Sequence, residues 1–194
     1  MGVYSLSKSS INNWVKYPNM MAGSVELSSD WLITQTVLGS AQASVTFDVS
    51  TLAAQGFKHL QVRVVHKMET ANETCLVRFN GDTSTNYRTH RFTGNGSAVS
   101  SADFTPGSYI VPISATGTGA GTFTASIFDI LDFSSSTKNK TSRSLSGRLD
   151  ASGNEINLYS GIWFSTAAIT SITIYATVGN IAVGSRFSLY ASKG

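Results

Sequence analysis

Charged residues are scarce in this chain of 194 residues: Asp, Glu, Lys and Arg make up 13% of it, whereas soluble domains usually contain about 25%. Because Ser, Thr and Gly are abundant, we expect a surface whose polarity comes mainly from hydroxyl and amide groups, which neighbouring proteins cover easily. The formal net charge is only +3, and the basic residues are scattered, with no stripe of interleaved aromatic residues. This distribution argues against nucleic-acid binding.

Cysteine and long apolar runs are almost absent as well. The single cysteine, Cys75, excludes a disulfide within the chain, and its alternation with Val77 and Phe79 predicts a small, buried apolar side chain. No apolar run approaches the length of about 18 residues that a membrane-spanning helix requires, and the first residues lack the apolar stretch of a secretion signal. We therefore expect a protein that folds in a cytoplasm and does not enter a membrane.

Patterns that indicate catalysis or metal binding are missing too. The three histidines have no metal-binding spacing, and His66 falls on the apolar face of its expected strand, as a core histidine does. Asp129 and Asp132 are three residues apart in an expected strand, so they point to opposite faces and cannot share a substrate. No nucleophile elbow, phosphate loop or zinc signature is present. We predict no enzymatic activity, no metal and no cofactor.

Short strand patterns recur from Trp31 onward, and no stretch of ten or more residues has a helical apolar period. His59–Met68 alternates apolar and polar residues, and Glu73–Phe79 follows after a short polar turn, which predicts an antiparallel hairpin. The spacing predicts an all-β, antiparallel jelly-roll β-sandwich over residues 31–194, with a closed barrel as the alternative. Its strands are expected near 32–38, 42–49, 59–68, 73–79, 86–92, 107–113, 122–133, 140–148, 156–164, 169–177 and 185–192.

Residues 1–30 differ in character, because they mix Ser and Asn with isolated large apolar residues that follow no period. Such a segment predicts an extended N-terminal arm that docks either on its own domain or on a neighbouring subunit. The side chains expected to anchor it at a protein interface are Trp14, Tyr17, Met20 and Met21.

The strand expected around residues 127–133 is apolar on both faces, although a sheet in a two-layer sandwich has only one core face. Strict alternation places Ile127, Leu131 and Phe133 on one face and Phe128 and Ile130 on the other. Either a loop or the arm covers the second face, or another subunit does. The residues predicted to lie at such an interface are Phe128, Ile130 and Trp163, the last because it must point opposite to both of its apolar neighbours.

Two polar segments are further candidates for contact. Residues 80–86 place oxygen-bearing side chains at alternate positions, as a calcium loop does, but with a single carboxylate, so a turn capped by Asn80 and Asp82 with Gly81 at positive φ is favoured. The strand that follows forms either a polar contact surface or a solvated strand edge. The residues of this possible ligand or contact surface are Asp82, Tyr87, Arg88, His90 and Arg91.

The densest basic cluster follows the two-faced strand. It is expected either to be solvated or to pair with an acidic patch of a neighbouring protein. Its members are Lys138, Lys140, Arg143 and Arg148.

The order of several segments resembles a family of single-domain β-proteins from the virion-structure regions of tailed bacteriophage genomes. The resemblance covers about residues 52–190 and rests on Arg78–Asp82, Asn86–Tyr87, Phe128–Phe133, Lys138–Leu145, Gly161–Ile174 and Gly184–Tyr190. After Leu189 and Tyr190 this chain has Ala191 and Ser192, where relatives usually carry Gly and an aliphatic residue.

This resemblance implies a virion structural protein that is made in the cytoplasm of the bacterial host. We expect a capsid decoration or cement protein that binds the major capsid protein or other virion proteins, because the chain has no heptads, collagen-like repeat or β-helix period for a fibre shaft. Family analogy and capsid symmetry imply a homotrimer. The alternative is a tail or head-fibre component that binds a host surface glycan, with Tyr87, Tyr109 and Trp163 as stacking platforms.

Overall fold

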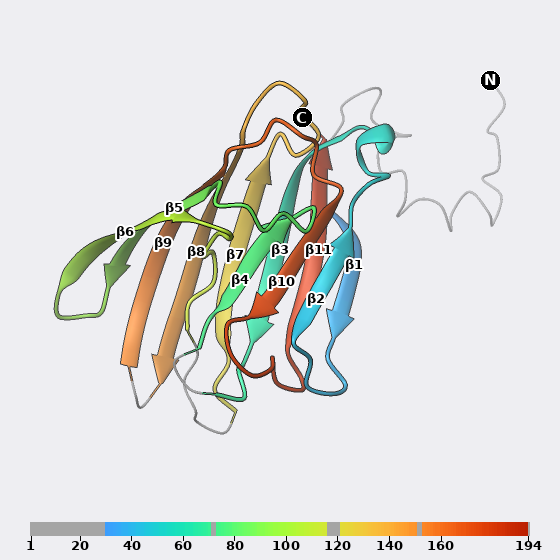
Figure 1. Cartoon of the computed structure of the whole chain (residues 1–194). Helices are drawn as coiled ribbons and strands as arrows, with labels where there is room; N and C mark the ends of the chain where they lie inside the picture. The colour runs from blue at the N-terminus through green and yellow to red at the C-terminus, as the bar shows by residue number, and fades with distance from the viewer. Residues whose placement is uncertain (1–29, 71–72, 116–120, 151–152, 194) are drawn as a thin grey trace, which may run out of the picture.

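The computed structural model describes residues 30–70, 73–115, 121–150 and 153–193, which form two antiparallel β-sheets packed face to face (Figure 1). The larger sheet has the strand order β1-β11-β3-β7-β8-β9-β5-β6, and the smaller one has the order β2-β10-β4. The strands are β1 (Trp31–Val37), β2 (Ser44–Asp48), β3 (Phe57–His66), β4 (Cys75–Phe79), β5 (Tyr87–Gly94), β6 (Val99–Gly107), β7 (Thr124–Leu131), β8 (Lys140–Asp150), β9 (Gly153–Trp163), β10 (Ser171–Ala176) and β11 (Arg186–Lys193).

The all-β class and the antiparallel, sandwich-like arrangement are thus confirmed. In the described residues the larger sheet ends at β1 and β6 without closing on itself, so the barrel alternative is wrong. The only helical element of these residues is a short 3-10 turn, η2 (Ala53–Gln55). The predicted arm, residues 1–30, lies outside the described residues except for Asp30.

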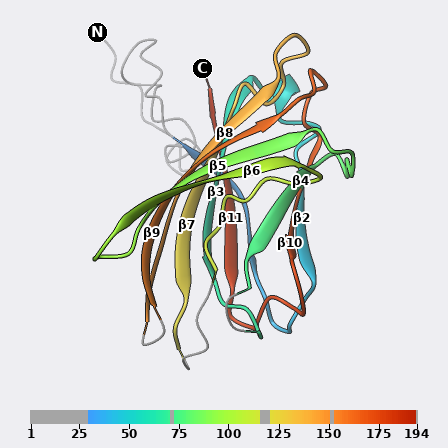
Figure 2. The same cartoon turned by 60° about the vertical axis from the view of Figure 1, so that its left-hand side comes forward.

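The core fills the space between the smaller sheet and the β1, β11, β3 and β7 half of the larger one (Figures 1 and 2). On β3, alternation buries Leu60, Val62 and Val64, as predicted. Phe79 of β4 lies at the centre of an aromatic group, 6.5 Å between ring centroids from Phe128 of β7. Apolar burial in this half therefore fixes which face of each strand points inward.

The predicted hairpin between the third and fourth strands is wrong. β3 pairs with β11 and β7 in the larger sheet, whereas β4 pairs with β10 in the smaller one. The connection after His66 crosses from one sheet to the other. Since each strand has one apolar face, the two can pack against each other across the core as well as pair side by side, and alternation alone does not distinguish these arrangements.

The other half of the larger sheet, β8, β9, β5 and β6, is covered on its inner side by an irregular segment, residues 108–114. Its Ile110 exchanges two backbone hydrogen bonds of 3.0 Å with Val77, beside the smaller sheet. A Cβ atom on Gly161 of β9 would lie 2.6 Å from the Ile110 side chain, so only glycine permits this close approach. The strand predicted near residues 107–113 is therefore this covering segment, and the regular strand is β6.

Serine, threonine and asparagine side chains of the larger sheet hold this covering segment in place. Ser146 Oγ accepts a hydrogen bond from the Ser114 N–H at 2.9 Å, and Thr89 Oγ1 accepts one from the Val111 N–H at 3.2 Å. Asn157 Nδ2 donates to Ser114 Oγ at 2.7 Å. The inner face of this half therefore combines these polar groups with the aromatic side chains of Tyr87, Tyr159 and Trp163, whereas its aliphatic residues Leu145, Ile156 and Leu158 are exposed on the outer side.

Candidate functional site

The side of the larger sheet that faces away from the smaller sheet exposes a continuous group of apolar side chains. Paired positions place Ile127, Leu145, Leu158 and Phe92 in one row across four adjacent strands, β7, β8, β9 and β5. Their exposed fractions are 44%, 50%, 52% and 49%. The term outer apolar patch refers to six of these exposed side chains, namely Val65, Phe92, Ile127, Leu145, Ile156 and Leu158.

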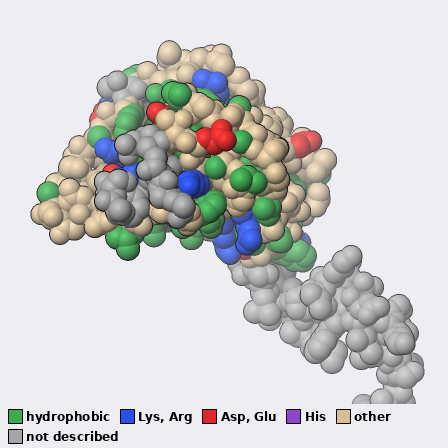
Figure 3. All heavy atoms as spheres, turned by 90° about the horizontal axis from the view of Figure 1, so that it is seen from below, with side chains coloured by type: hydrophobic (Ala, Val, Ile, Leu, Met, Phe, Trp, Pro, Cys, Tyr) green, Lys and Arg blue, Asp and Glu red, His purple; other side chains and the backbone are tan. Residues whose placement is uncertain are grey.

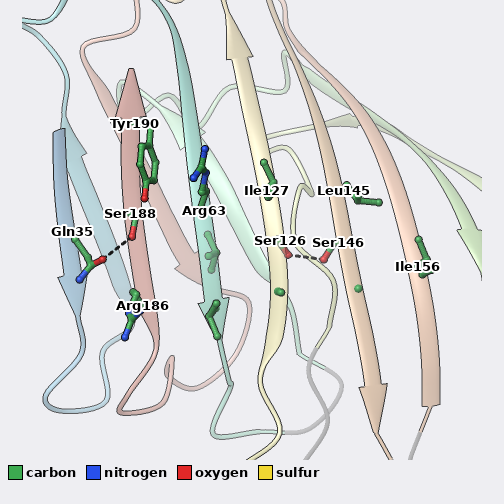
Figure 4. A pocket seen from close by; sticks show the side chains of 14 residues that line it. Gln35, Arg63, Ser126, Ile127, Leu145, Ser146, Ile156, Arg186, Ser188 and Tyr190 are labelled. Atoms are coloured by element: carbon green, nitrogen blue, oxygen red, sulfur yellow. Dashed lines mark hydrogen bonds between the residues drawn. The ribbon is translucent and has the colours of Figure 1, made fainter. Parts of the chain in front are cut away.

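Small residues next to this row leave a hollow in the outer surface. Ala125 of β7 pairs with Gly147 of β8, and Val65 of β3 and Ile156 of β9 flank the two. The hollow has a volume of about 570 Å³. Figure 4 shows Ile127, Leu145 and Ile156 around it on one side and the side chains of β1, β11 and β3 on the other.

The polar side of the hollow has a defined geometry. The guanidinium carbon of Arg63 lies 4.1 Å from the centre of the Tyr190 ring, and Arg63 Nη2 is 3.2 Å from Asp30 Oδ2. Gln35 Oε1 accepts a hydrogen bond of 3.2 Å from Ser188 (Figure 4). Side chains of β1, β3 and β11 thus form an ordered rim beside the outer apolar patch.

The charges of the next row are paired within the sheet. Arg143 Nε of β8 lies 3.1 Å from Oδ2 of Asp129 on β7. The other carboxylate oxygen of Asp129, Oδ1, accepts a hydrogen bond from Gln61. Arg88 of β5 binds Asp103 of β6 through both ends of its guanidinium, which raises the pKa of Arg88 and lowers the pKa of Asp103. The outer surface therefore combines apolar area with ion pairs that already neutralise one another.

The residues that the sequence predicted at an interface are buried inside the chain. Phe128 and Ile130 are 0% exposed and Trp163 is 3% exposed, all within the core. The prediction that these three side chains form an interface is therefore corrected. The same strand instead exposes Ile127 and Leu131, and Phe133 is buried because Asp132, at φ 50°, ends the alternation. The predicted anchors of the arm, Trp14, Tyr17, Met20 and Met21, lie outside the described residues.

The predicted polar contact surface is divided between the two sides of the sheet. Arg88 and His90 are exposed on the outer side, in register with Ile162 and Ser160 of β9. Tyr87 is fully buried, and its hydroxyl accepts a hydrogen bond from the Phe79 N–H at 3.1 Å. The group of five thus forms no single surface.

Arg91 and Asp82 complete this division. The Arg91 guanidinium lies 5.4 Å from the centre of the Phe104 ring on the inner side. Asp82 accepts hydrogen bonds from Trp163 Nε1 at 2.7 Å, Asn86 Nδ2 at 2.9 Å and the Ser84 N–H at 2.8 Å. Partial burial disfavours its charge, but these donors outweigh that effect and lower the pKa of Asp82 to about 2.

The turn favoured at residues 80–82 is confirmed for Gly81 and Asp82, but Asn80 does not cap its own backbone and the turn closes no hairpin, because β4 and β5 lie in different sheets. Gly81 has φ 66°, and Asp82 caps the backbone of Ser84. Asn80 Oδ1 accepts hydrogen bonds from the N–H groups of Thr170 and Ser171, at 2.8 and 3.1 Å. The turn therefore joins the start of β10 to the end of β4, and its oxygen atoms are engaged by protein donors.

The predicted basic cluster is dispersed. Lys138 pairs with Asp132 at 2.6 Å, and Lys140 is 1% exposed. The Lys140 ammonium donates to the carbonyls of Ser135, Lys138 and Thr166 at 2.7, 2.8 and 3.2 Å, so it closes the loop between β7 and β8. Burial lowers the pKa of Lys140. Sequence reasoning missed this role, which no local pattern indicates.

Comparison of the chain with protein-family models, with curated protein sequences and with solved structures gives no match. The geometry of the described residues is therefore the basis for a functional conclusion.

The described ranges contain neither a metal-binding cluster nor a membrane-spanning helix. No group of three or more His, Cys, Asp and Glu side chains there is arranged to hold a metal ion. Among the same residues, no helix has the length and apolar character to span a membrane. Seen from below, the described part of the molecule presents mostly backbone atoms and side chains that are neither hydrophobic nor charged, with hydrophobic side chains and few charged ones among them (Figure 3).

His66 is buried, as predicted, with 0% exposure. Burial lowers its pKa from 6.5 to about 4. At pH values between these two pKa values, the imidazole is protonated in the unfolded chain but not in the folded chain. The free energy of unfolding therefore falls as the pH falls. We expect a loss of about 2 kcal/mol between pH 7.5 and pH 5 from this group, measured by urea unfolding.

The control for this prediction is a second histidine. His90→Gln, on the exposed side of β5, should retain the pH dependence, whereas His66→Gln should reduce it. Equal pH dependence in the parent and in His66→Gln would contradict the assignment.

Proposed function

We propose that this chain is a structural protein of a bacteriophage virion whose outer sheet face is covered by another protein subunit in the particle. The single observation that supports this proposal most directly is the outer apolar patch, in which six side chains on five adjacent strands are each exposed by 44% to 63%. Contiguous apolar surface of this kind on a soluble protein typically marks a protein interface. The scarcity of charge, 13% of residues, agrees with a surface that other proteins cover.

The chemistry of the face favours a protein partner over a small molecule. Its carboxylates Asp103 and Asp129 are already paired with Arg88 and Arg143. Few polar groups therefore remain to orient a polar ligand, whereas a protein partner requires mainly complementary shape and apolar area.

Within the virion we propose a capsid decoration or cement role, with the major capsid protein as one neighbour. The sequence resemblance supports the virion, and the absence of a fibre-shaft repeat in the sequence supports the capsid over the tail. Added interface between capsomers stabilises a shell, because every bound contact favours the assembled state. The homotrimer stays a prediction from family analogy.

We also propose that the sandwich is a jelly roll with two inserted hairpins. In this assignment the first sheet is β1-β11-β3-β7, and the second is β2-β10-β4 with residue 110 beside β4. Successive strands of the assigned set then alternate between the sheets, except that β4 and the segment at residue 110 are neighbours in the second sheet, which is compatible with the two Greek keys of a jelly roll. The inserted pairs β5–β6 and β8–β9 extend the first sheet.

The glycan-binding alternative loses two of its three proposed stacking platforms, and the third, Tyr109, is partly buried against the cluster of Leu76, Val111 and Tyr159. Tyr87 is fully buried and Trp163 is 3% exposed, so neither ring offers a face to a sugar. No second function is therefore proposed.

The test is the number of copies of this chain per purified virion, measured by quantitative mass spectrometry against the major capsid protein. We expect a ratio near one to one, or another fixed lattice fraction. A few to a few tens of copies per particle would contradict the cement role and indicate a tail, portal or vertex position. Absence from purified particles would contradict the virion role itself.

A further inference from the structure

We propose that the outer apolar patch binds the same patch on a second copy of this chain, so that two larger sheets stack face to face. Only the location of this pair in a virion depends on the proposed function; the pairing itself does not. The occupant is inferred from the area, the charge and the shape of the face, each given by described residues.

The area is sufficient for a specific pair. Six side chains that are each about half exposed present on the order of 500 Å² of apolar surface, at the upper end of what a typical monomer leaves open. The rim adds Tyr190, Gln61 and the outward side chains of β11 and β3. Apolar centre and polar rim together approach the roughly 800 Å² per partner of a standard interface.

The charge of the face fits a copy of itself. Three carboxylates on this side, those of Asp30, Asp103 and Asp129, are each paired with an arginine of the same face. These pairs neutralise one another within one copy, but Arg186, which lines the hollow from β11, brings one further positive charge that a pair of copies must keep at the exposed rim. A strongly acidic or basic partner would gain little from such a surface.

The shape of the face also allows two copies to pack against each other. The row of Ile127, Leu145 and Leu158 projects from the sheet, and the hollow of about 570 Å³ over Ala125 and Gly147 lies beside it. In a two-fold arrangement each copy supplies both features, so the row of one copy fills the hollow of the other. Stacked sheets with interdigitated side chains are the ordinary packing of β-sandwich layers, at a spacing of about 10 Å.

The experiment measures the mass of the full-length chain by sedimentation and light scattering from about 1 to 100 µM. We expect a monomer–dimer equilibrium, whereas the homotrimer that family analogy implies would contradict this pairing. Leu145→Glu and Leu158→Glu each place a charge in the patch without removing a core side chain, because both positions are about half exposed. Each should raise the dimer dissociation constant at least about 100-fold, with an unchanged circular dichroism spectrum and melting temperature.

The matched control is Val178→Glu, which makes the same change at a side chain that is 58% exposed outside the larger sheet. It should leave the dimer unchanged. A parent chain that stays monomeric at 100 µM, with the thiol of a Leu145→Cys variant equally reactive at all concentrations, would overturn the proposal. A monomeric Leu145→Cys variant whose thiol is protected even at 1 µM would also overturn the proposal, since the chain itself would then cover the patch.

A dimer that resists both patch variants would also overturn it, because the contact would lie elsewhere. These outcomes are independent of copy number. A chain found in virions but monomeric in solution would leave the structural role standing and make another virion protein the occupant. A dimer absent from virions would leave the pairing standing and contradict the virion role.

Discussion

The Phe128→Asp variant is expected not to fold. The Phe128 ring is fully buried and stacks on Phe79, with an interplanar angle of 5°. Replacing it removes a large apolar side chain, which alone costs about 3–5 kcal/mol, and places a carboxylate where no described cation offers a partner. The sum is comparable to the whole stability of a domain, about 5–15 kcal/mol. Expression as insoluble protein, or a chain without a cooperative urea transition, is the expected result.

The neighbouring position on the same strand is the control. Ile127→Asp introduces the same charge at a side chain that is 44% exposed on the outer face, and its free energy of unfolding should stay within about 1 kcal/mol of the parent value. A folded, soluble Phe128→Asp protein would contradict the burial of this ring and restore the interpretation of Phe128 as an interface residue.

The strands themselves are largely predictable from the sequence, because a period of two in apolar residues has one simple cause. Leu60, Val62 and Val64 must share a face, and burial selects that face as the inner one. The turn at Gly81 and Asp82 was predictable for a similar reason, since an Asx cap and a glycine at positive φ are local effects, whereas the long-range contacts of Asn80 with Thr170 and Ser171 were not.

Strand partners were not predictable in the same way. Sequence proximity favoured a hairpin between β3 and β4, but the two strands lie in different sheets. β3 pairs with β7 and β11, which lie about 60 and 125 positions away in the chain. Nothing in a single strand specifies so distant a neighbour. β6 was missed because Val99–Gly107 has little apolar alternation and contains Pro106, which an edge strand tolerates.

The outer face was half predictable. Apolar residues on both sides of β7 correctly indicated that one apolar side lies outside the core, but alternation does not identify which side. The pattern of β8 is misleading, because its inward side chains are polar and its outward side chains include an apolar one. The inward residues are Ser142, Ser144 and Ser146, and the outward ones include Leu145. The usual rule would turn Leu145 inward. It fails here because the covering segment 108–114 has no regular strand partner along its length and instead donates a hydrogen bond to Ser146 Oγ and accepts one from Ser144 Oγ.

The Trp163→Ala variant is expected to lose about 3–5 kcal/mol of stability, the usual cost of removing a buried aromatic side chain. The indole lies 5.7 Å from the Phe79 ring and 6.0 Å from the Tyr87 ring, nearly parallel to the latter. Its removal leaves a cavity beside two fixed aromatic residues that cannot collapse into it without moving both sheets. Urea unfolding followed by circular dichroism measures this change.

Trp163→Phe separates packing from hydrogen bonding. The phenyl ring retains most of the aromatic contact but removes the donor to Asp82, so we expect a loss of about 1–2 kcal/mol at pH 7. The pKa of Asp82 should rise from about 2 toward its ordinary value. Because the lowered pKa stabilises the fold above about pH 4 and this contribution is lost as the pH falls toward 2, the difference between the variant and the parent should shrink in acid.

A surface role for this side chain would give the opposite pattern. If Trp163 were an exposed platform for a sugar or a partner protein, Trp163→Ala would fold with the parent stability and lose only binding. Buried as it is, with its indole N–H bound to a carboxylate of the same chain, its replacement should reduce stability in the absence of any ligand. Parent-like stability of Trp163→Ala would therefore refute the aromatic core described above.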